Sequence, residues 1–218
     1  VSNNSTANFS IVKYTGTGSG NSTVGHGLGT TPTFILLKHL GRSQNWRAFH
    51  TAEGVGETGF LNDSAAWAAD PDRISAVSST TFTAAANMNE SADYIAYCFA
   101  DVEGYSKFSS FSGNGSTDGP YVHLGFKPAL LILKVSSNAP TGWIILDNKR
   151  DSFNAVNHVL QPNTSSAENT GADFWDFLSN GFKVRNTWAA ANGSGYTVTF
   201  AAFAHSPFKT ATAFGIES

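Results

Sequence analysis

Two stretches of this sequence share one pattern: His26-Gly-Leu-Gly-Thr-Thr-Pro32-Thr-Phe-Ile-Leu-Leu-Lys38 and His123-Leu-Gly-Phe-Lys-Pro128-Ala-Leu-Leu-Ile-Leu-Lys134. In each, a proline precedes a short apolar run that ends on a lysine, and both residues recur 96 positions later. An uninterrupted apolar run of this length is typical of a strand buried on both faces. A proline just before the strand removes no hydrogen bond from the sheet. The two stretches therefore predict two equivalent central strands, each capped at the surface by its lysine.

The similarity extends on both sides of these strands. Upstream, Tyr14-Thr-Gly16-Thr-Gly18 matches Phe111-Ser-Gly113-Asn-Gly115, and downstream Trp46 matches Trp143. Two later matches follow at slowly increasing offsets: Ser79-Thr-Thr-Phe82 with Ser179-Asn-Gly-Phe182, and Cys98-Phe-Ala100 with Ala202-Phe-Ala204. Self-similarity in a fixed order indicates an internal repeat. We interpret the chain as two homologous units, residues 1–102 and residues 103–218, joined without a linker and packed together.

Composition favours β-structure in both units, because turn-forming and β-branched residues are common while strong helix formers such as Leu and Glu are sparse. The expected strands of the first unit are 9–15, 22–27, 33–40, 45–51, 59–62, 74–84 and 92–102. Those of the second unit are 106–112, 120–125, 129–136, 142–147, 157–161, 181–187 and 195–205. Two short helices are expected, at Ser64–Ala69 and Asp173–Leu178. This pattern predicts an all-β fold of two tandem, jelly-roll-like β-sandwich units.

Charge and cysteine content exclude several classes of protein. Only 13% of the 218 residues are charged, with 13 Lys plus Arg and a net charge of −3, so the basic footprint of a nucleic-acid binder is missing. No apolar stretch is long enough to span a membrane, and no signal peptide is visible. The single cysteine, Cys98, excludes an intrachain disulfide framework and a cysteine-based zinc site. We expect neither a nucleic-acid partner nor membrane insertion.

Motifs that carry catalysis or hold a cofactor are weak here. Gly54-Val-Gly56-Glu-Thr-Gly59 fits the glycine pattern of dinucleotide sites, but strand-like and turn residues follow it instead of a helix. The six histidines lack metal-ligand spacing, and we expect the matched pair His26 and His123 to share a structural task. The acidic pairs Asp70/Asp72 and Asp173/Asp176 do not match between the units, so a glycosidase is the weaker alternative. We expect no catalytic residue, no cofactor and no metal.

Five tryptophans are the most distinctive side chains. Trp46 and Trp143 are equivalent in the repeat, so we interpret them as core anchors. Trp67, Trp175 and Trp188 occur in one unit only and lie near Ala- or Asn-rich segments. Exposed aromatic faces stack on sugars while Asn, Ser and Thr bond the hydroxyl groups, so these three are the candidate carbohydrate-binding residues. The alternative is that they fill contacts between units or subunits.

Two phrases of the sequence point to a family: YCFADVEGYSKF at 97–108 and GFKPALLILK at 125–134. Together with the repeat around them, they resemble a repeated β-rich domain of tailed-bacteriophage virion proteins, found near the C-terminal end of tail or fibre-like proteins. The resemblance spans residues 9–208 and carries no catalytic motif. The chain opens on Val1, and we expect it to be one domain of a longer protein.

That resemblance implies a protein of the virion surface, in the tail or a fibre, that contacts other virion proteins. It also implies a homo-oligomer, for which we expect a trimer, and attachment to a host-surface glycan. One alternative is an architectural domain without receptor binding, such as a capsid decoration or tail spacer. A polysaccharide-degrading enzyme is the weaker alternative.

Overall fold

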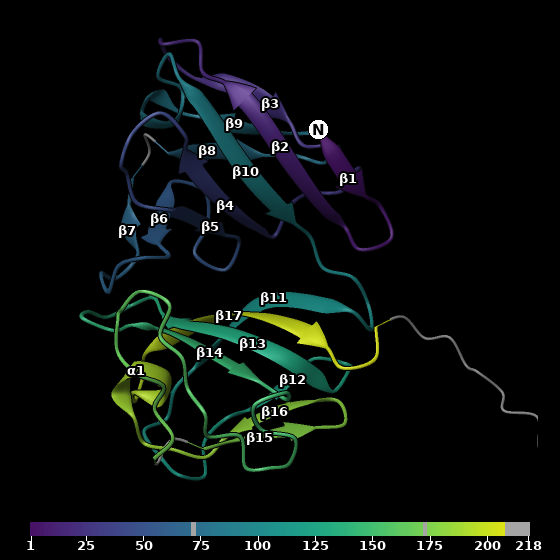
Figure 1. The fold of residues 1–218 in the computed structure, drawn as a ribbon, viewed down its shortest axis with the longest axis vertical. Coiled ribbons are helices and arrows are strands. Elements are labelled where there is room, and N and C mark those ends of the chain that lie inside the picture. Colours follow the sequence, from purple (N-terminus) through teal and green to yellow (C-terminus); the bar gives the residue numbers. More distant parts are fainter. Residues whose placement is uncertain (71–72, 172–173, 208–218) are drawn as a thin grey trace, which may run out of the picture.

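The fold consists of two β-sandwiches, one built from each half of the chain (Figure 1). The structure is a computed structural model that describes residues 1–70, 73–171 and 174–207. Every strand pair in it is antiparallel and joins strands of the same half. Within these residues no helix is long and apolar enough to cross a membrane.

The first half forms a large sheet with the order β1-β2-β10-β4-β5-β6-β7 and a small sheet with the order β3-β9-β8. One short 3-10 helix, η1 (Ala86–Met88), precedes the last strand. The strands are β1 (Ser2–Asn4), β2 (Phe9–Thr15), β3 (Ser22–Gly25), β4 (Phe34–His39), β5 (Arg47–His50), β6 (Glu57–Phe60), β7 (Ala68–Ala69), β8 (Ile74–Val77), β9 (Thr81–Ala84) and β10 (Asp93–Phe99).

The second half forms a large sheet with the order β11-β17-β13-β14 and a small sheet with the order β12-β16-β15. The helix α1 (Ala189–Asn192) precedes its last strand, as η1 does in the first half. The strands are β11 (Ser106–Ser112), β12 (Tyr121–His123), β13 (Pro128–Val135), β14 (Trp143–Asp147), β15 (Trp175–Leu178), β16 (Gly181–Val184) and β17 (Thr197–Ala204).

The strand order of one half repeats in the other. The series β2-β10-β4-β5 corresponds to β11-β17-β13-β14, and β3-β9-β8 corresponds to β12-β16-β15. The register agrees as well, because Tyr97 pairs with Ile11 and Leu36, just as Ala201 pairs with Phe108 and Ile132. The prediction of an all-β fold of sandwich units is confirmed.

Each sandwich encloses its own hydrophobic core, because alternate side chains of a strand point to the same face of the sheet. In the first half, Ile35 and Leu37 on β4 meet Phe82 on β9. In the second half, Leu131 and Leu133 on β13 meet Phe182 on β16. The apolar runs before Lys38 and Lys134 are therefore central strands of the two sandwiches.

A buried asparagine fastens the same turn in both halves. Asn89 donates from Nδ2 to the carbonyl oxygens of Ser19 and Gly20, and it accepts the backbone N–H of Thr17 at 2.8 Å. Asn192 likewise donates to the carbonyl oxygen of Ser116 and accepts the backbone N–H of Asn114 at 2.9 Å.

The paired glycines of the sequence repeat lie in these turns. A side chain at Gly16 would overlap the backbone at Glu90, and one at Gly113 would overlap the backbone at Gly193.

The two halves contact each other through the outer faces of their large sheets (Figure 1). A third hydrophobic cluster joins them, made of Phe34, Ala48, Trp67, Phe108, Trp143 and Ala201. Polar bonds cross the same boundary: Trp143 Nε1 donates to Phe60 O at 2.7 Å, and Trp67 N donates to Ser136 O at 2.9 Å. The boundary is therefore packed and hydrogen-bonded rather than a flexible join.

Several local predictions were wrong. Residues 64–69 form no helix but lead into β7, and 174–178 contain the strand β15; Asp173 lies outside the described residues. Trp175 and Phe177 alternate into the core, which is the period of a strand. The expected strand at 74–84 is a hairpin of β8 and β9, and 157–161 makes only isolated bridges.

The two strand-ending lysines also differ from expectation. Lys38 is half-buried, whereas Lys134 is 0% exposed and does not cap its strand at the surface. Its ammonium donates to Thr141 O at 2.6 Å and to Thr141 Oγ1 at 2.8 Å. Burial among these neutral acceptors lowers the pKa of Lys134 to about 8.

Candidate binding site

The strongest candidate site lies on the long segment that connects β14 to β15. In its described part, residues 148–171 and 174, it contains no regular strand or helix, only isolated bridges at Val156, Val159, Leu160 and Asn169. Long ordered loops of this kind in a compact domain are usually functional. Side chains hold this segment together with the few backbone hydrogen bonds of these bridges, because no continuous β-ladder runs along it.

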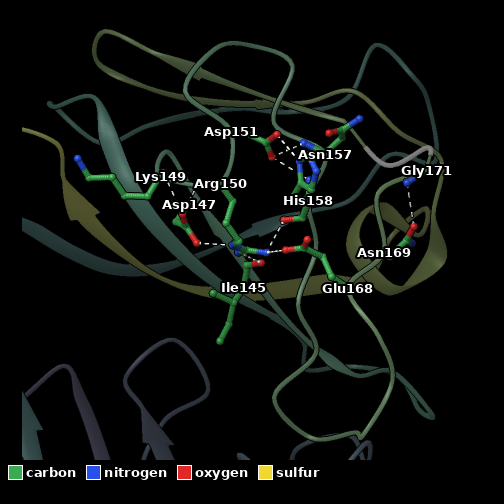
Figure 2. A network of polar contacts seen from close by, with 10 residues as sticks. All are labelled: Ile145, Asp147, Lys149, Arg150, Asp151, Asn157, His158, Glu168, Asn169 and Gly171. Atoms are coloured by element: carbon green, nitrogen blue, oxygen red, sulfur yellow. Dashed lines mark hydrogen bonds and ion pairs between the residues drawn. The ribbon is translucent and has the colours of Figure 1, made fainter.

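Arg150 holds the base and the far end of this loop together (Figure 2). Its guanidinium pairs with Asp147 Oδ2 at 2.7 Å and with Glu168 Oε1 at 2.7 Å. It also donates to the carbonyl oxygens of His158 at 3.0 Å and Ile145 at 3.1 Å. Burial by itself would raise the pKa of Asp147, but the bonds from Arg150 and from the backbone lower it, so the carboxylate stays charged.

Asp151 fixes the middle of the loop (Figure 2). Its Oδ2 accepts the backbone N–H groups of Asn157 at 2.9 Å and His158 at 2.8 Å, and its Oδ1 contacts His158 Nδ1. Although burial opposes ionisation, these bonds lower the pKa of Asp151. Asn154 then fastens the loop to β15, since its side chain accepts from Phe177 N at 2.9 Å and donates to Phe177 O at 3.1 Å.

A pocket of about 140 Å³ opens between this loop and the sheet. Its polar lining comes from the loop and from Lys127, the residue before β13, and two aromatic rings complete it. The lining residues are Lys127, Asn148, Asp151, Ser152, Phe153, Asn154, Val156 and Phe177. The Phe153 ring is 85% exposed, the most exposed large apolar side chain of the described chain.

Polar groups with unused bonding capacity line the same pocket. Asn148 contacts the His205 ring through its amide nitrogen, but its Oδ1 has no hydrogen-bond partner. Within the residues that the structure describes, the Lys127 ammonium has no ion pair. Lys127 also lines a second, more open pocket of about 340 Å³ that includes Phe126 and His205. An exposed ring next to hydroxyl, amide and ammonium groups suits a hydroxyl-rich ligand.

The structure buries two of the three predicted carbohydrate-binding tryptophans. Trp175 is 0% exposed in the second core, and Trp67 is 8% exposed in the cluster between the halves. Neither ring has a face on which a sugar could stack, so we assign both to packing. Trp188 is half-buried against the second core and remains a prediction. Of the expected core anchors, Trp143 is 3% exposed, but Trp46 is only half-buried.

The two matched histidines do not share one task. His26 is buried, accepts the backbone N–H of Leu28 on Nδ1 and donates from Nε2 to Ser78 O at 3.1 Å. Burial lowers its pKa, so the ring is neutral in the fold. His123 is exposed, and its Nδ1 lies 3.4 Å from Tyr121 Oη. The strand register gives the reason: Val24 pairs with Phe82 as Val122 pairs with Phe182, so His26 is equivalent to Leu124 and not to His123. The predicted match of the two histidines was therefore wrong.

Acidic and metal-binding groups form no reactive cluster in the described part of the chain. No group of three or more His, Cys, Asp or Glu side chains comes together there. Asp70 pairs with Arg73, and Asp176 pairs with Arg185 at 2.7 Å, so each is neutralised by an arginine. Asp72 and Asp173 lie outside the described residues. The glycine motif is structural, since Gly54 and Gly56 have φ values of +95° and +86°, a region that favours glycine.

The profile of one protein family, described as "Domain of unknown function (DUF7483)", matches residues 1–207. The chain belongs to the DUF7483 family. That match covers both sandwiches, so one DUF7483 domain contains both copies of the repeat. No curated protein and no solved structure matches the chain.

Sequence reasoning missed Phe153 and the loop that carries it. Phe153 lies in an Asp-, Asn- and Ser-rich stretch that reads as an ordinary surface loop. Two features of the sequence could have indicated this loop: the first unit has no counterpart to Arg150 and Asp151, and the segment 148–174 is long.

Proposed function

We propose that this chain is a structural domain of a tailed-phage virion, in the tail or a fibre, and that it contributes to attachment to a host-surface glycan. The observation that carries the binding role is the exposed Phe153 ring beside the polar pocket of the β14–β15 loop. The phage assignment is supported by the resemblance of residues 97–108 and 125–134 to virion proteins.

The chemistry of the pocket supports a sugar as the ligand. The face of an aromatic ring packs against the C–H groups of a sugar, while Asn148, Ser152 and Lys127 can bond its hydroxyl groups. The Arg150 and Asp151 networks order the loop before any ligand arrives, which reduces the entropy lost on binding. A pocket of about 140 Å³ suits one sugar unit, so single-site affinity would be low and many copies on one particle would supply avidity.

An architectural role without receptor binding is the second candidate. The observation in its favour is the half-exposed apolar face of the first large sheet, around Trp46 and Tyr97, which suits a contact between proteins. The two roles are compatible, because that face and the pocket lie on different halves of the chain.

Binding of the multivalently displayed chain to a glycan array and to host cells tests the attachment role. We expect Phe153→Ala to weaken binding by about tenfold or more, as loss of an aromatic anchor usually does. Phe174→Ala is the matched control, because Phe174 is 38% exposed on the same half but does not line the pocket. Circular dichroism would show that both variants are folded.

Three results would count against glycan attachment by this pocket. The wild-type chain could fail to bind host cells or any glycan at high avidity, which would leave the architectural role. Phe153→Ala and Phe174→Ala could bind as well as wild type, which would place the receptor contact elsewhere. Release of reducing sugar from host polysaccharide would instead favour an enzyme.

A further inference from the structure

The outer face of one large sheet is covered, while the equivalent face of the other is open. Strand register makes five positions of the first half equivalent to five of the second. The first-half face is Ile11, Lys38, Trp46, Ile95 and Tyr97, and the second-half face is Phe108, Lys134, Trp143, Thr199 and Ala201.

Exposure separates the two faces clearly. Every residue of the second-half face is at most 4% exposed. On the first-half face, Ile11 is 36% exposed and the other four are half-buried. The first-half face is also a continuous surface, since the Trp46 and Tyr97 rings lie 6.1 Å apart and the Lys38 ammonium lies 5.9 Å from the Trp46 ring.

One loop of the first half, which we name the covering loop (residues 61–67), buries much of the second-half face. It follows β6, which lies beside the second half in Figure 1. Thr141 N donates to Ser64 O at 3.0 Å, and Trp67 N donates to Ser136 O at 2.9 Å. The Trp67 ring packs in the same cluster as the small side chain of Ala201.

The second half carries the same loop, but in the described structure that loop is exposed, and its Glu168 side chain pairs with Arg150 of its own half. We name residues 162–168 the free loop. Its base matches that of the covering loop: Asn62 Oδ1 accepts Trp46 N at 2.8 Å, and Asn163 Oδ1 accepts Trp143 N at 2.8 Å. The pairing at the ends of the hairpin also agrees, with Thr58 opposite Ala68 and Val159 opposite Asn169. Residues 164–168 are exposed.

The side chains at equivalent positions differ between the two loops and between the two faces. The covering loop brings the large Trp67 to the small Ala201. The matched loop bases make Glu168 the counterpart of Trp67, and Tyr97 is the counterpart of Ala201. The free loop therefore carries Glu168, paired with Arg150, and the hydroxyl side chains of Thr164, Ser165 and Ser166, whereas the first-half face carries the Tyr97 ring.

We infer that copies of this chain associate head to tail, with the free loop of one copy docked on the first-half face of the next. The contact reproduces between chains the one that the covering loop makes within a chain. It is continuous with the existing cluster, since Leu36 on the same sheet face already packs against it. A head-to-tail contact generates a ring or a filament. This inference is independent of glycan binding.

Two complementary variants test the inference in sedimentation equilibrium of the whole chain. Leu40→Glu blocks the first-half face at its edge, where Leu40 is 50% exposed and equivalent to Ser136 of the covered contact. Ser165→Arg blocks the free loop. Val55→Glu is the charge-matched control, because Val55 is 52% exposed and lies outside both surfaces. All three positions are exposed, so we expect the variants to melt as the wild type does.

The wild type and Val55→Glu should form assemblies larger than a dimer as concentration rises. Each blocked variant alone should associate at least about tenfold more weakly. An equimolar mixture of the two should form a dimer and nothing larger, because one intact loop and one intact face remain. A monomeric wild type at the highest concentration, unchanged assembly of Leu40→Glu, or a monomeric mixture would overturn the inference. Assembly of Ser165→Arg alone would show a symmetric face-to-face contact instead.

Discussion

Acid is expected to weaken the boundary between the two halves through a single buried histidine, His50 on β5. Its Nδ1 accepts the backbone N–H of Ala52 at 3.1 Å, so the ring proton must be on Nε2, which donates across the boundary to Phe200 O at 3.2 Å. The ring is 2% exposed and lies 6.5 Å from the Trp67 ring, edge to face. Burial therefore lowers the pKa of His50 from 6.5 to about 4.

The lowered pKa of His50 decides whether acid raises or lowers the stability of the fold. Below pH 6.5 the unfolded chain binds a proton at this residue, whereas the folded chain does so only near pH 4. The contribution of His50 to stability is therefore complete above pH 6.5 and is lost as the pH falls towards 4. The full shift corresponds to roughly 3 kcal/mol, of which about 2 kcal/mol is lost between pH 8 and pH 5.

Urea unfolding followed by tryptophan fluorescence measures this effect between pH 8 and pH 5. Protonation of carboxylates such as Asp147 and Asp151 also lowers the free energy of unfolding in acid. The wild type is therefore compared with His50→Gln, in which these carboxylates are unchanged. The stability advantage of the wild type over His50→Gln should shrink by about 2 kcal/mol at the lower pH. His123→Gln, at an exposed histidine, is the control. An advantage that stays constant with pH, or an NMR titration of His50 near pH 6.5, would refute the reasoning.

Three further changes test the packing. In the folded chain the pKa of Lys134 is lowered to about 8, so its amine loses its proton at a lower pH than it does in the unfolded chain. The free energy of unfolding should therefore rise by roughly 3 kcal/mol between pH 8 and 10.5 in the wild type but not in Lys134→Met. Equal slopes in alkaline urea titrations would contradict this. Gly59→Ala places a Cβ 2.5 Å from Trp67 Cε2 and should cost about 1–3 kcal/mol in thermal unfolding, whereas Gly54→Asn, at a φ of +95° with open space around it, should cost less. Asn89→Ala leaves buried backbone groups of the Gly18 turn unbonded and should cost about 2 kcal/mol or more by calorimetry, and an unchanged melting temperature would show that water replaces them.

The sequence predicted a strand best where the residues of that strand alone require burial on both faces. The apolar runs at 34–37 and 130–133 can be buried on both faces only in the middle of a sheet, so their position was predictable. Matching glycines and tryptophans at regular offsets required two copies of one unit, and the same strand order followed in both. Short amphipathic segments were less predictable. The pattern of residues 174–178 fits a helix or a strand, and only pairing with β16 makes it a strand.

What the sequence alone determined, then, is a duplicated all-β fold with its central strands, because periodicity and repeat spacing are local properties of the chain. The tertiary structure decided which of two equivalent residues is covered. Lys134 and Trp143 are buried while Lys38 and Trp46 are not, since the covering loop reaches one face only. It also decided that Phe153 stands beside a pocket while Trp67 and Trp175 are enclosed, because burial depends on residues distant in the sequence.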